Sequence, residues 1–202
     1  MKQLLAETIF QRIGASIVDG TLPSGSRIRD ADLAEEFNVS RMPIREALQR
    51  LERIGLVEMH PSRFTEVTEV SPEDTANARQ YAGYVGGAIA AIAVPRLREE
   101  TRLQLVDHVR ALDGLLDDSA RLAESRWGVI RALATKSGND VFQTMLDETS
   151  LLIVRNLRPW VLSGYEQDRM RALHADLAAA MLDGDGHAAE RAVRGIHGVQ
   201  NI

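Results

Sequence analysis

One stretch of the sequence, residues 30–57, restricts the fold more than any other, because it reads as two short helices joined by a tight turn. Asp30 is placed to cap the first helix, and Asn38 tolerates the left-handed backbone that a sharp turn requires. Ser40 is a good N-cap for the second helix, where Pro43 is tolerated because the amide it lacks would be unpaired in the first turn. The stretch therefore predicts a helix-turn-helix.

Both helices carry an apolar face that has to be buried. The first is expected to bury Leu33, Ala34 and Phe37. The apolar residues of the second recur at intervals of three and four, which places them on one side of a helix; they are Ile44, Ala47, Leu48, Leu51 and Ile54. Gly55 is expected to end this helix.

A polar strip lies on the other side of the second helix. At about 100° per residue, Arg41, Met42, Arg45 and Gln49 fall within one arc. Guanidiniums near a capped helix N-terminus can bind phosphates or make bidentate bonds to guanine, and a glutamine can bond adenine or a phosphate. The strip indicates a helix that reads DNA, with Ser40 at its start. On periodicity alone, a helical hairpin with a solvated charged face is an equally good interpretation.

The residues that follow favour DNA binding. Residues 56–67 read as strand, Pro-containing turn and strand, and a β-hairpin directly after a recognition helix is a wing. His60 and Arg63 lie in this wing and are candidates for contact with the DNA backbone. Arg27, in a short extended segment, is a candidate phosphate contact, although a solvated surface role fits it equally well. A helix over residues 5–19 is expected to pack its apolar side, which includes Leu5, behind the helix-turn-helix.

These motifs make the first part of the chain resemble a known family. The motifs are Leu22–Ile28, Leu33–Glu35, Val39–Leu48, Leu51–Glu52 and Gly55–Val57. Together they resemble the winged-helix domain of the GntR family of bacterial transcription regulators, over about residues 5 to 70. The resemblance departs at the wing, where Phe64 stands after Arg63 in place of an expected glycine. A bulky ring there puts insertion of the wing tip into the minor groove in doubt.

The charge of the chain gives no general support to nucleic-acid binding. The net charge is −5, and residues 1–70 carry nine Lys+Arg against eleven Asp+Glu, or −2. The basic signal is local, because Arg41–Arg63 holds five arginines against three glutamates. DNA contact would then be confined to a small patch, and pairing two such domains in a homodimer would raise the affinity.

Length and composition point to an ordinary cytoplasmic protein. A chain of 202 residues can bury one large core or two modest ones. Cysteine is absent, which excludes disulfides and thiolate metal sites and is typical of a reducing compartment. No apolar run reaches the 18 residues that would suggest a membrane helix, and the N-terminus does not form a signal peptide. We expect a soluble cytoplasmic chain with no membrane partner.

The second part of the chain reads as helix throughout. Ser71 caps and Pro72 opens a new helix, so the expected domains are 1–70 and 71–202. The expected helices span 72–93, 96–117, 119–137, 140–157, 166–183 and 186–198. About six helices with short connections predict an antiparallel bundle. The fold class is therefore mainly α, with a winged helix-turn-helix that carries a small β-hairpin wing, followed by an all-α bundle.

Small residues are concentrated in the first helix of this bundle, over residues 81–91. Gly86 and Gly87 in mid-helix cost roughly 1 kcal/mol each relative to alanine. Close approach of another helix is the simplest compensation, and a ligand-sized void beside the glycines is the alternative.

The bundle resembles the FCD ligand-binding domain of the FadR branch of the GntR family, over residues 72–198. The resemblance rests on Arg79 with Ala90–Ala91, on Ser137–Asn139, and on a set that runs from His174 through Gly184–Asp185 and Ala188–Ala189 to His197. It implies a divalent metal such as zinc or nickel, held by an Asp and a His four residues apart and by two later histidines. By position these are Glu124, Gly128, His174 and His197, so one ligand is lost at Gly128. The remaining three could hold a metal or be a vestige.

The resemblance also implies an organic acid as the effector. Arg79 matches an arginine that could pair with a carboxylate, and Trp127 and Arg131 are expected to share the inner face of the helix that carries Glu124. Asn139 either lines the cavity or caps the next helix, and capping is favoured. Gly83 replaces an expected acidic residue. With the lost histidine, this indicates a remodelled pocket.

The sequence thus predicts a DNA-binding transcriptional regulator, in the form of a repressor, and not an enzyme. Its bundle is expected to dimerise and sense a small molecule, and two-fold symmetry predicts a palindromic operator. One alternative is a helical metalloenzyme that uses Glu124, His174 and His197. Another is a protein-interaction adaptor whose winged helix no longer binds DNA.

Overall fold

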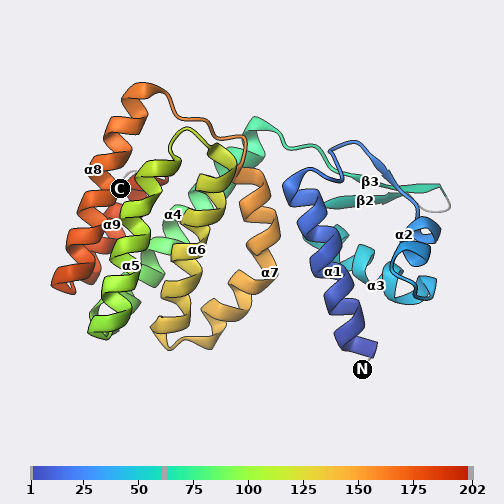
Figure 1. Cartoon of the computed structure of the whole chain (residues 1–202), viewed down its shortest axis with the longest axis horizontal. Coiled ribbons are helices and arrows are strands. Elements are labelled where there is room, and N and C mark those ends of the chain that lie inside the picture. The colour runs from blue at the N-terminus through green and yellow to red at the C-terminus, as the bar shows by residue number, and fades with distance from the viewer. Residues whose placement is uncertain (1, 61–62, 200–202) are drawn as a thin grey trace. The chain divides into compact units, whose positions relative to one another are not determined.

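The computed structural model describes residues 2–60 and 63–199. By its internal contacts the chain divides into two compact units, Met1–Ser71 and Pro72–Ile202. Figure 1 shows a small unit of helices and strands and a larger unit of helices, the second of which holds α4 to α9. None of the described helices combines the length and the apolarity that crossing a membrane would require.

The N-terminal unit is a three-helix cluster with a small sheet. Its elements are α1 (Lys2–Asp19), β1 (Arg27–Ile28), α2 (Asp30–Glu36), α3 (Arg41–Arg53), β2 (Val57–His60) and β3 (Phe64–Val67). The sheet is antiparallel with the order β1-β3-β2, and β2 and β3 form the expected hairpin with Val57 opposite Val67 and His60 opposite Phe64. The winged helix-turn-helix predicted from the sequence is confirmed.

The core of this unit is aliphatic and lies between α1 and α3. The expected apolar face of α3 is buried: Ile44, Ala47, Leu48 and Leu51 are at most 1% exposed. Ile9, Ile13 and Ile17 of α1 are also buried. Leu5 is 40% exposed, so its predicted place in this core was wrong; it lies in the first turns of α1, beyond the buried stripe.

The turn between α2 and α3 has the predicted backbone but not all of the predicted caps. Asn38 has a φ of 52°, in the left-handed region that asparagine tolerates. Ser40 occupies the N-cap position of α3, although its side chain makes no capping hydrogen bond. Asp30 does not cap α2: it is the first residue of that helix, and Arg29 stands at the N-cap.

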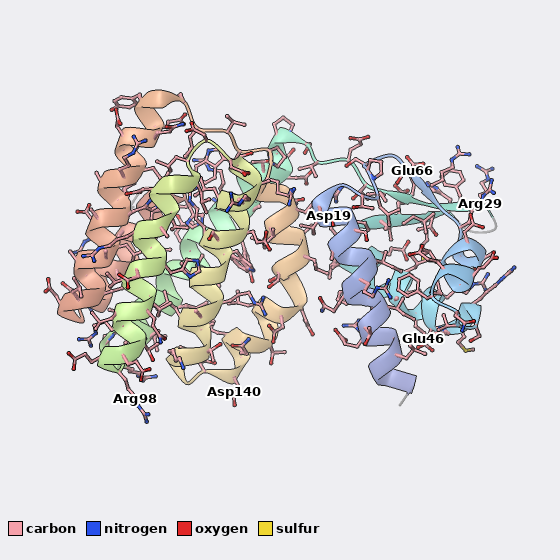
Figure 2. The ribbon with its side chains drawn as sticks, viewed as in Figure 1. Asp19, Arg29, Glu46, Glu66, Arg98 and Asp140 are labelled. Carbon is pink, nitrogen blue, oxygen red and sulfur yellow. The ribbon has the colours of Figure 1, made fainter. Side chains whose placement is uncertain are left out.

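The C-terminal unit is a helical bundle. Its elements are α4 (Pro72–Ala93), the 3₁₀ turn η1 (Val94–Arg96), α5 (Glu99–Ala111), the 3₁₀ turn η2 (Leu112–Leu115), α6 (Ser119–Ser137), α7 (Asp140–Leu157), α8 (Gly164–Asp183) and α9 (Gly186–Ile196). The prediction of one helix over 96–117 was wrong, since 3₁₀ turns flank a shorter α5. In Figure 2, Arg98 and Asp140 mark one end of the bundle, where α5 and α7 begin.

The glycines of α4 allow α9 and α6 to approach closely. A Cβ at Gly87 would come within 3.2 Å of the Arg194 side chain on α9, and one at Gly86 would press on Ile130 of α6. A Cβ at Gly83 would come within 2.5 Å of Val199. The close-packing interpretation of the small-residue stretch is confirmed, because side chains of the same chain occupy the space beside each of these glycines.

Candidate DNA-binding face and effector site

The polar strip of α3 is presented to solvent. Arg41, Met42, Arg45 and Gln49 are all exposed, and Met42 is 68% exposed. The buried residues of the same helix form a separate face, so one side of the helix is anchored in the core and the strip is exposed on another side. Figure 2 labels Glu46 on this helix; it is also exposed, so the strip has an acidic neighbour.

Arg45 is held in place by an ion pair across the helix-turn-helix. Its Nε donates to Oδ2 of Asp30 at 2.9 Å, and the Arg45 side chain is still 66% exposed. An exposed ion pair of this kind contributes about 0–1 kcal/mol to stability. Its main consequence is that it orients the Arg45 side chain. The other guanidinium donors of Arg45 remain available to an incoming acceptor.

Arg50 belongs to the same helix but not to the strip. Its Nη1 donates to Glu7 of α1 at 2.6 Å, and its guanidinium lies 4.1 Å from the centre of the Phe10 ring. The hydrogen bond from Arg50 lowers the pKa of Glu7. Arg50 therefore ties α3 to α1, and the basic signal counted along the sequence overstates what is free for DNA.

The wing and β1 form a small aromatic and basic group. The guanidinium of Arg27 lies 4.1 Å above the ring of Phe64, and the His60 ring is 4.6 Å from the same ring. His60 Nε2 is also 3.7 Å from the Glu58 carboxylate. Phe64 is thus half-buried between these side chains, whereas Arg63 is exposed. Pro61 and Ser62 of the predicted turn lie outside the described residues.

A second group of polar side chains is buried inside the helical bundle. It consists of Arg126 on α6, His174 on α8 and His197 at the end of α9, which are 4%, 1% and 3% exposed. Arg79 of α4 lies beside them and donates through Nε to the His197 carbonyl at 3.3 Å. The guanidiniums of Arg79 and Arg126 lie 4.0 and 4.9 Å from the centre of the Trp160 ring. We refer to these five residues as the inner cluster.

Hydrogen bonds fix the two imidazoles in one orientation. His174 Nδ1 donates to the Asp113 carboxylate at 2.7 Å, and His197 Nδ1 donates to the Val193 carbonyl at 3.0 Å. Each ring therefore carries its remaining lone pair on Nε2, and both Nε2 atoms are buried without a hydrogen-bond partner among the described residues. This donation from the other ring nitrogen also occurs in metal-bound histidines.

Burial and the neighbouring guanidiniums disfavour protonation of both rings. Burial is the largest cause and lowers the pKa of His197 to about 4, assisted by the charges of Arg126 and Arg79 and opposed by the bond to Val193. Burial also lowers the pKa of His174, with Asp113 acting in the opposite direction. Both imidazoles are neutral at pH 7.

The residues present do not fit the metal site implied by the sequence. Glu124 is exposed on α6, away from the buried histidines, and the described residues include no group of three His, Cys, Asp or Glu side chains that could hold a metal. Arg126 and Ile130, which lie two positions after the predicted Glu124 and Gly128, are both buried on α6. Neither supplies a ligand atom, and Arg126 adds a positive charge. The predicted ligand set was wrong.

The other predicted effector residues have mixed outcomes. Trp127 is buried, but its indole N–H donates to Ser150 at 2.9 Å within the core. Arg131 is exposed and pairs with Asp147 at 3.4 Å, so its predicted place on the inner face was wrong. Asn139 is exposed and caps α7 by accepting from the Val141 N–H, as the favoured interpretation predicted.

Sequence reasoning missed Arg126 and Trp160 of the inner cluster, and also Asp113, which is hydrogen-bonded to its His174. Arg126 was hidden by the two-residue error in the position of the inner face of α6. Asp113 was hidden by the prediction of a continuous helix, whereas it lies in the 3₁₀ turn η2. Trp160 directly follows the Pro159 helix break, which was the one available signal that it lies at a helix end.

This fold and its two sites define a winged-helix DNA-binding protein with a helical ligand-binding unit. Comparison with known families is consistent with this. Residues 5–67 match the bacterial regulatory proteins of the gntR family, and residues 83–197 match the FCD domain. The chain belongs to the GntR family of transcriptional regulators, in the FadR-type group that carries an FCD domain.

Relatives with this architecture extend over nearly the whole chain. The chain is 25% identical over 198 residues to the transcriptional regulator LutR of Bacillus subtilis, covering 88% of this chain and 90% of LutR. It is 23% identical over 200 residues to the transcriptional repressor RspR of Escherichia coli, covering 95% and 85%. The solved structure of E. coli McbR/YncC superposes with a TM-score of 0.71 at 18% identity, covering 96% of this chain and 93% of that one. The chain is a DNA-binding transcriptional regulator with an effector-binding domain.

Proposed function

We propose that this regulator is a homodimeric repressor that binds a palindromic operator and responds to an organic acid bound in its helical unit. It would act on DNA in the cytoplasm. The relative RspR is named a repressor, which supports the sign of regulation. The observation that carries the operator-binding part is the exposed strip of Arg41, Met42, Arg45 and Gln49 on an anchored α3.

The small number of free basic groups on one N-terminal unit supports a two-fold symmetric complex. One N-terminal unit offers few free basic groups and has a net charge of −2 over residues 1–70, so a single unit is expected to bind DNA weakly. Two units on one duplex would combine their affinities, and their symmetry would be matched by an inverted repeat. An effector would act by favouring one arrangement of the two N-terminal units over another.

The alternative functions have less support. The metalloenzyme interpretation needed Glu124 beside two histidines, and Glu124 is exposed instead. The adaptor interpretation needed a winged helix without a DNA-binding face, and the four strip residues are all exposed.

The test of operator reading is Arg45→Ala. The operator is first selected from random duplexes with the full chain, and binding is then measured by fluorescence anisotropy against salt concentration. Loss of one base or phosphate contact predicts weaker specific binding by about 1–3 kcal/mol. Arg53→Ala is the matched control, since Arg53 is exposed in the last turn of the same helix. Equal operator affinity for wild type and Arg45→Ala would remove Arg45 from the DNA-binding face.

A further inference from the structure

The guanidinium of Arg126 is the most unusual group in the bundle. It is 4% exposed, and its Nε and Nη2 have no hydrogen-bond partner within residues 2–60 and 63–199. Burial, assisted by the charge of Arg79, lowers the pKa of Arg126 to about 9, so the group remains charged at pH 7. A buried charge without a partner is costly and is seldom retained without a compensating interaction. Within the described parts of the chain, Arg126 forms no ion pair with a carboxylate.

The surroundings of Arg126 leave an excess of positive charge. Arg79 contributes a second guanidinium, and the guanidiniums of Arg79 and Arg126 both lie near the ring of Trp160. Among the described residues, the carboxylate that is hydrogen-bonded to a side chain of the cluster is that of Asp113, which accepts from His174 Nδ1. Glu166 is linked to Arg79 only by its charge, and it is engaged in the capping box of α8 with Ser163. The inner cluster is therefore complementary to an anion.

The unpaired atoms define the chemistry of that anion more narrowly. Nε and Nη2 lie on one edge of a guanidinium, and this edge binds a carboxylate through two parallel hydrogen bonds. The two free Nε2 atoms of His174 and His197 are acceptors, so they are complementary to hydroxyl groups rather than to a second carboxylate. His174 also lines a cavity of about 200 Å³ together with Asp113, Arg110 and Leu182, so this cavity borders the cluster at His174, whereas Arg126, His197 and Trp160 are not among its lining residues.

We propose that the inner cluster binds a small hydroxycarboxylate directly, without a metal ion, with its carboxylate on Arg126 and its hydroxyl group donating to a histidine Nε2. The guanidinium supplies the positive charge that an acid needs, so no metal ion is required in this site. This inference rests on the proposed effector-sensing function and specifies how the acid is held. The apolar face of Trp160 would form one wall of the site.

The experiment measures ligand binding to the full chain by isothermal titration calorimetry after treatment with a chelator. The probes are lactate, its deoxy analogue propionate, and the longer pair gluconate and hexanoate. At least one hydroxycarboxylate is expected to bind the metal-free protein more tightly than its deoxy partner. Added zinc is expected to leave that affinity unchanged.

Three variants locate the carboxylate. Arg126→Met is expected to weaken binding on the order of 100-fold, because it removes a charged pair of hydrogen bonds. Arg126→Lys keeps the charge but not the two parallel donors, and is expected to weaken binding on the order of 10-fold. Arg131→Met is the control on the same helix, where the exposed side chain pairs with Asp147, and is expected to bind as wild type does. Thermal melting of each variant reports whether the fold is kept; Arg126→Met should melt no lower than wild type.

Other results would overturn the inference. Binding that appears only when zinc is restored would show that the acid is held by a metal, while the effector-sensing function would stand. Binding by Arg126→Met equal to wild type would place the ligand elsewhere. Failure of every probe to bind, with and without zinc, would overturn both the inference and the organic-acid effector. Operator binding, measured separately on the same preparations, would still test the DNA-binding function.

Discussion

Two arginines of α3 that lie five residues apart have opposite roles because their partners differ. Arg45 pairs with Asp30 and stays 66% exposed, whereas Arg50 is bonded to Glu7 and covers the Phe10 ring. The first is available to DNA and the second holds two helices together. A basic residue in a DNA-binding unit therefore gains its function from what already binds it.

Asp30 is expected to compete with DNA for Arg45. Asp30→Asn removes a negative charge from the binding face and releases the Arg45 guanidinium, so operator affinity should rise several-fold at low salt, with a smaller gain at high salt. Fluorescence anisotropy at several salt concentrations measures this. Asp32→Asn, an exposed acid in the same helical turn, is the control and should have a smaller effect. A lower affinity for Asp30→Asn would show instead that the ion pair orients Arg45 for binding.

Periodicity predicts residues on an exposed face better than residues in an interior. Arg41, Met42, Arg45 and Gln49 could be placed because the apolar stripe of α3 fixes the rotation of that helix. On α6 the small and apolar residues run almost all the way round, and an error of two residues turns a side chain by about 200°. Glu124 was placed there by the family resemblance, and no local pattern on α6 could correct that position to Arg126. The inner face of α6 is set by packing against α4 and α7, which no local pattern contains.

At the scale of elements, the bundle is built on the contact between its first and last helices. Gly83 and Gly87 of α4 lie against the chain from Glu190 to Val199, and Gly186 begins α9 directly against the backbone carbonyl of Ala91. Because His197 ends α9 and Arg79 lies on α4, this contact also sets the spacing of two residues of the inner cluster. Helix packing therefore sets part of the geometry of the inner cluster.

Gly186→Ala is expected to disturb this contact. A Cβ at this position would collide with the Ala91 backbone carbonyl, which cannot move as a flexible side chain can. Overpacking of this kind costs about 1–3 kcal/mol, which outweighs the gain of at most about 1 kcal/mol that alanine brings in helix propensity. Chemical denaturation of the full chain measures it.

Gly164→Ala is the matched control, since Gly164 begins α8 as Gly186 begins α9 and a Cβ there would have no neighbour within 4 Å. It should be neutral or slightly stabilising. Equal stability of the two variants would contradict the close approach of α9 to α4.

Helix boundaries were predicted well where the sequence contains a cap or a break. Gly138 and Gly184 end their helices with a positive φ, as predicted, whereas the start of α8 was predicted at residue 166 although Ser163 caps the helix and Gly164 begins it. The stretch over 96–117 has one such signal, Gly114 in its second 3₁₀ turn, which the prediction of a continuous helix did not use; Leu112 and Leu116 are buried on either side of it. Tertiary packing of these leucines decides the local geometry there, and it also places Asp113 against His174.

At the scale of the whole molecule, the two units have separate cores and separate tasks. Four residues, Thr68–Ser71, separate β3 from α4, and Thr68 still belongs to the first unit through bonds from its hydroxyl to Gly55 and Leu56 carbonyls. The N-terminal unit carries the operator-reading strip and the C-terminal unit carries the inner cluster. Because neither unit contains both sites, the proposed response to an effector requires communication between the two units.

A fragment of residues 1–71 tests this division. It has its own aliphatic core, so it should melt cooperatively by circular dichroism, although with low stability for its size. Without the C-terminal unit it is expected to be monomeric and to bind the operator at least about 100-fold more weakly than the full chain, since the linkage between two DNA-binding units is lost. The residual binding should still depend on Arg45, which the same fragment with Arg45→Ala checks. Operator affinity equal to that of the full chain would mean that a single unit suffices, and that the helical bundle does not act by pairing two DNA-binding units.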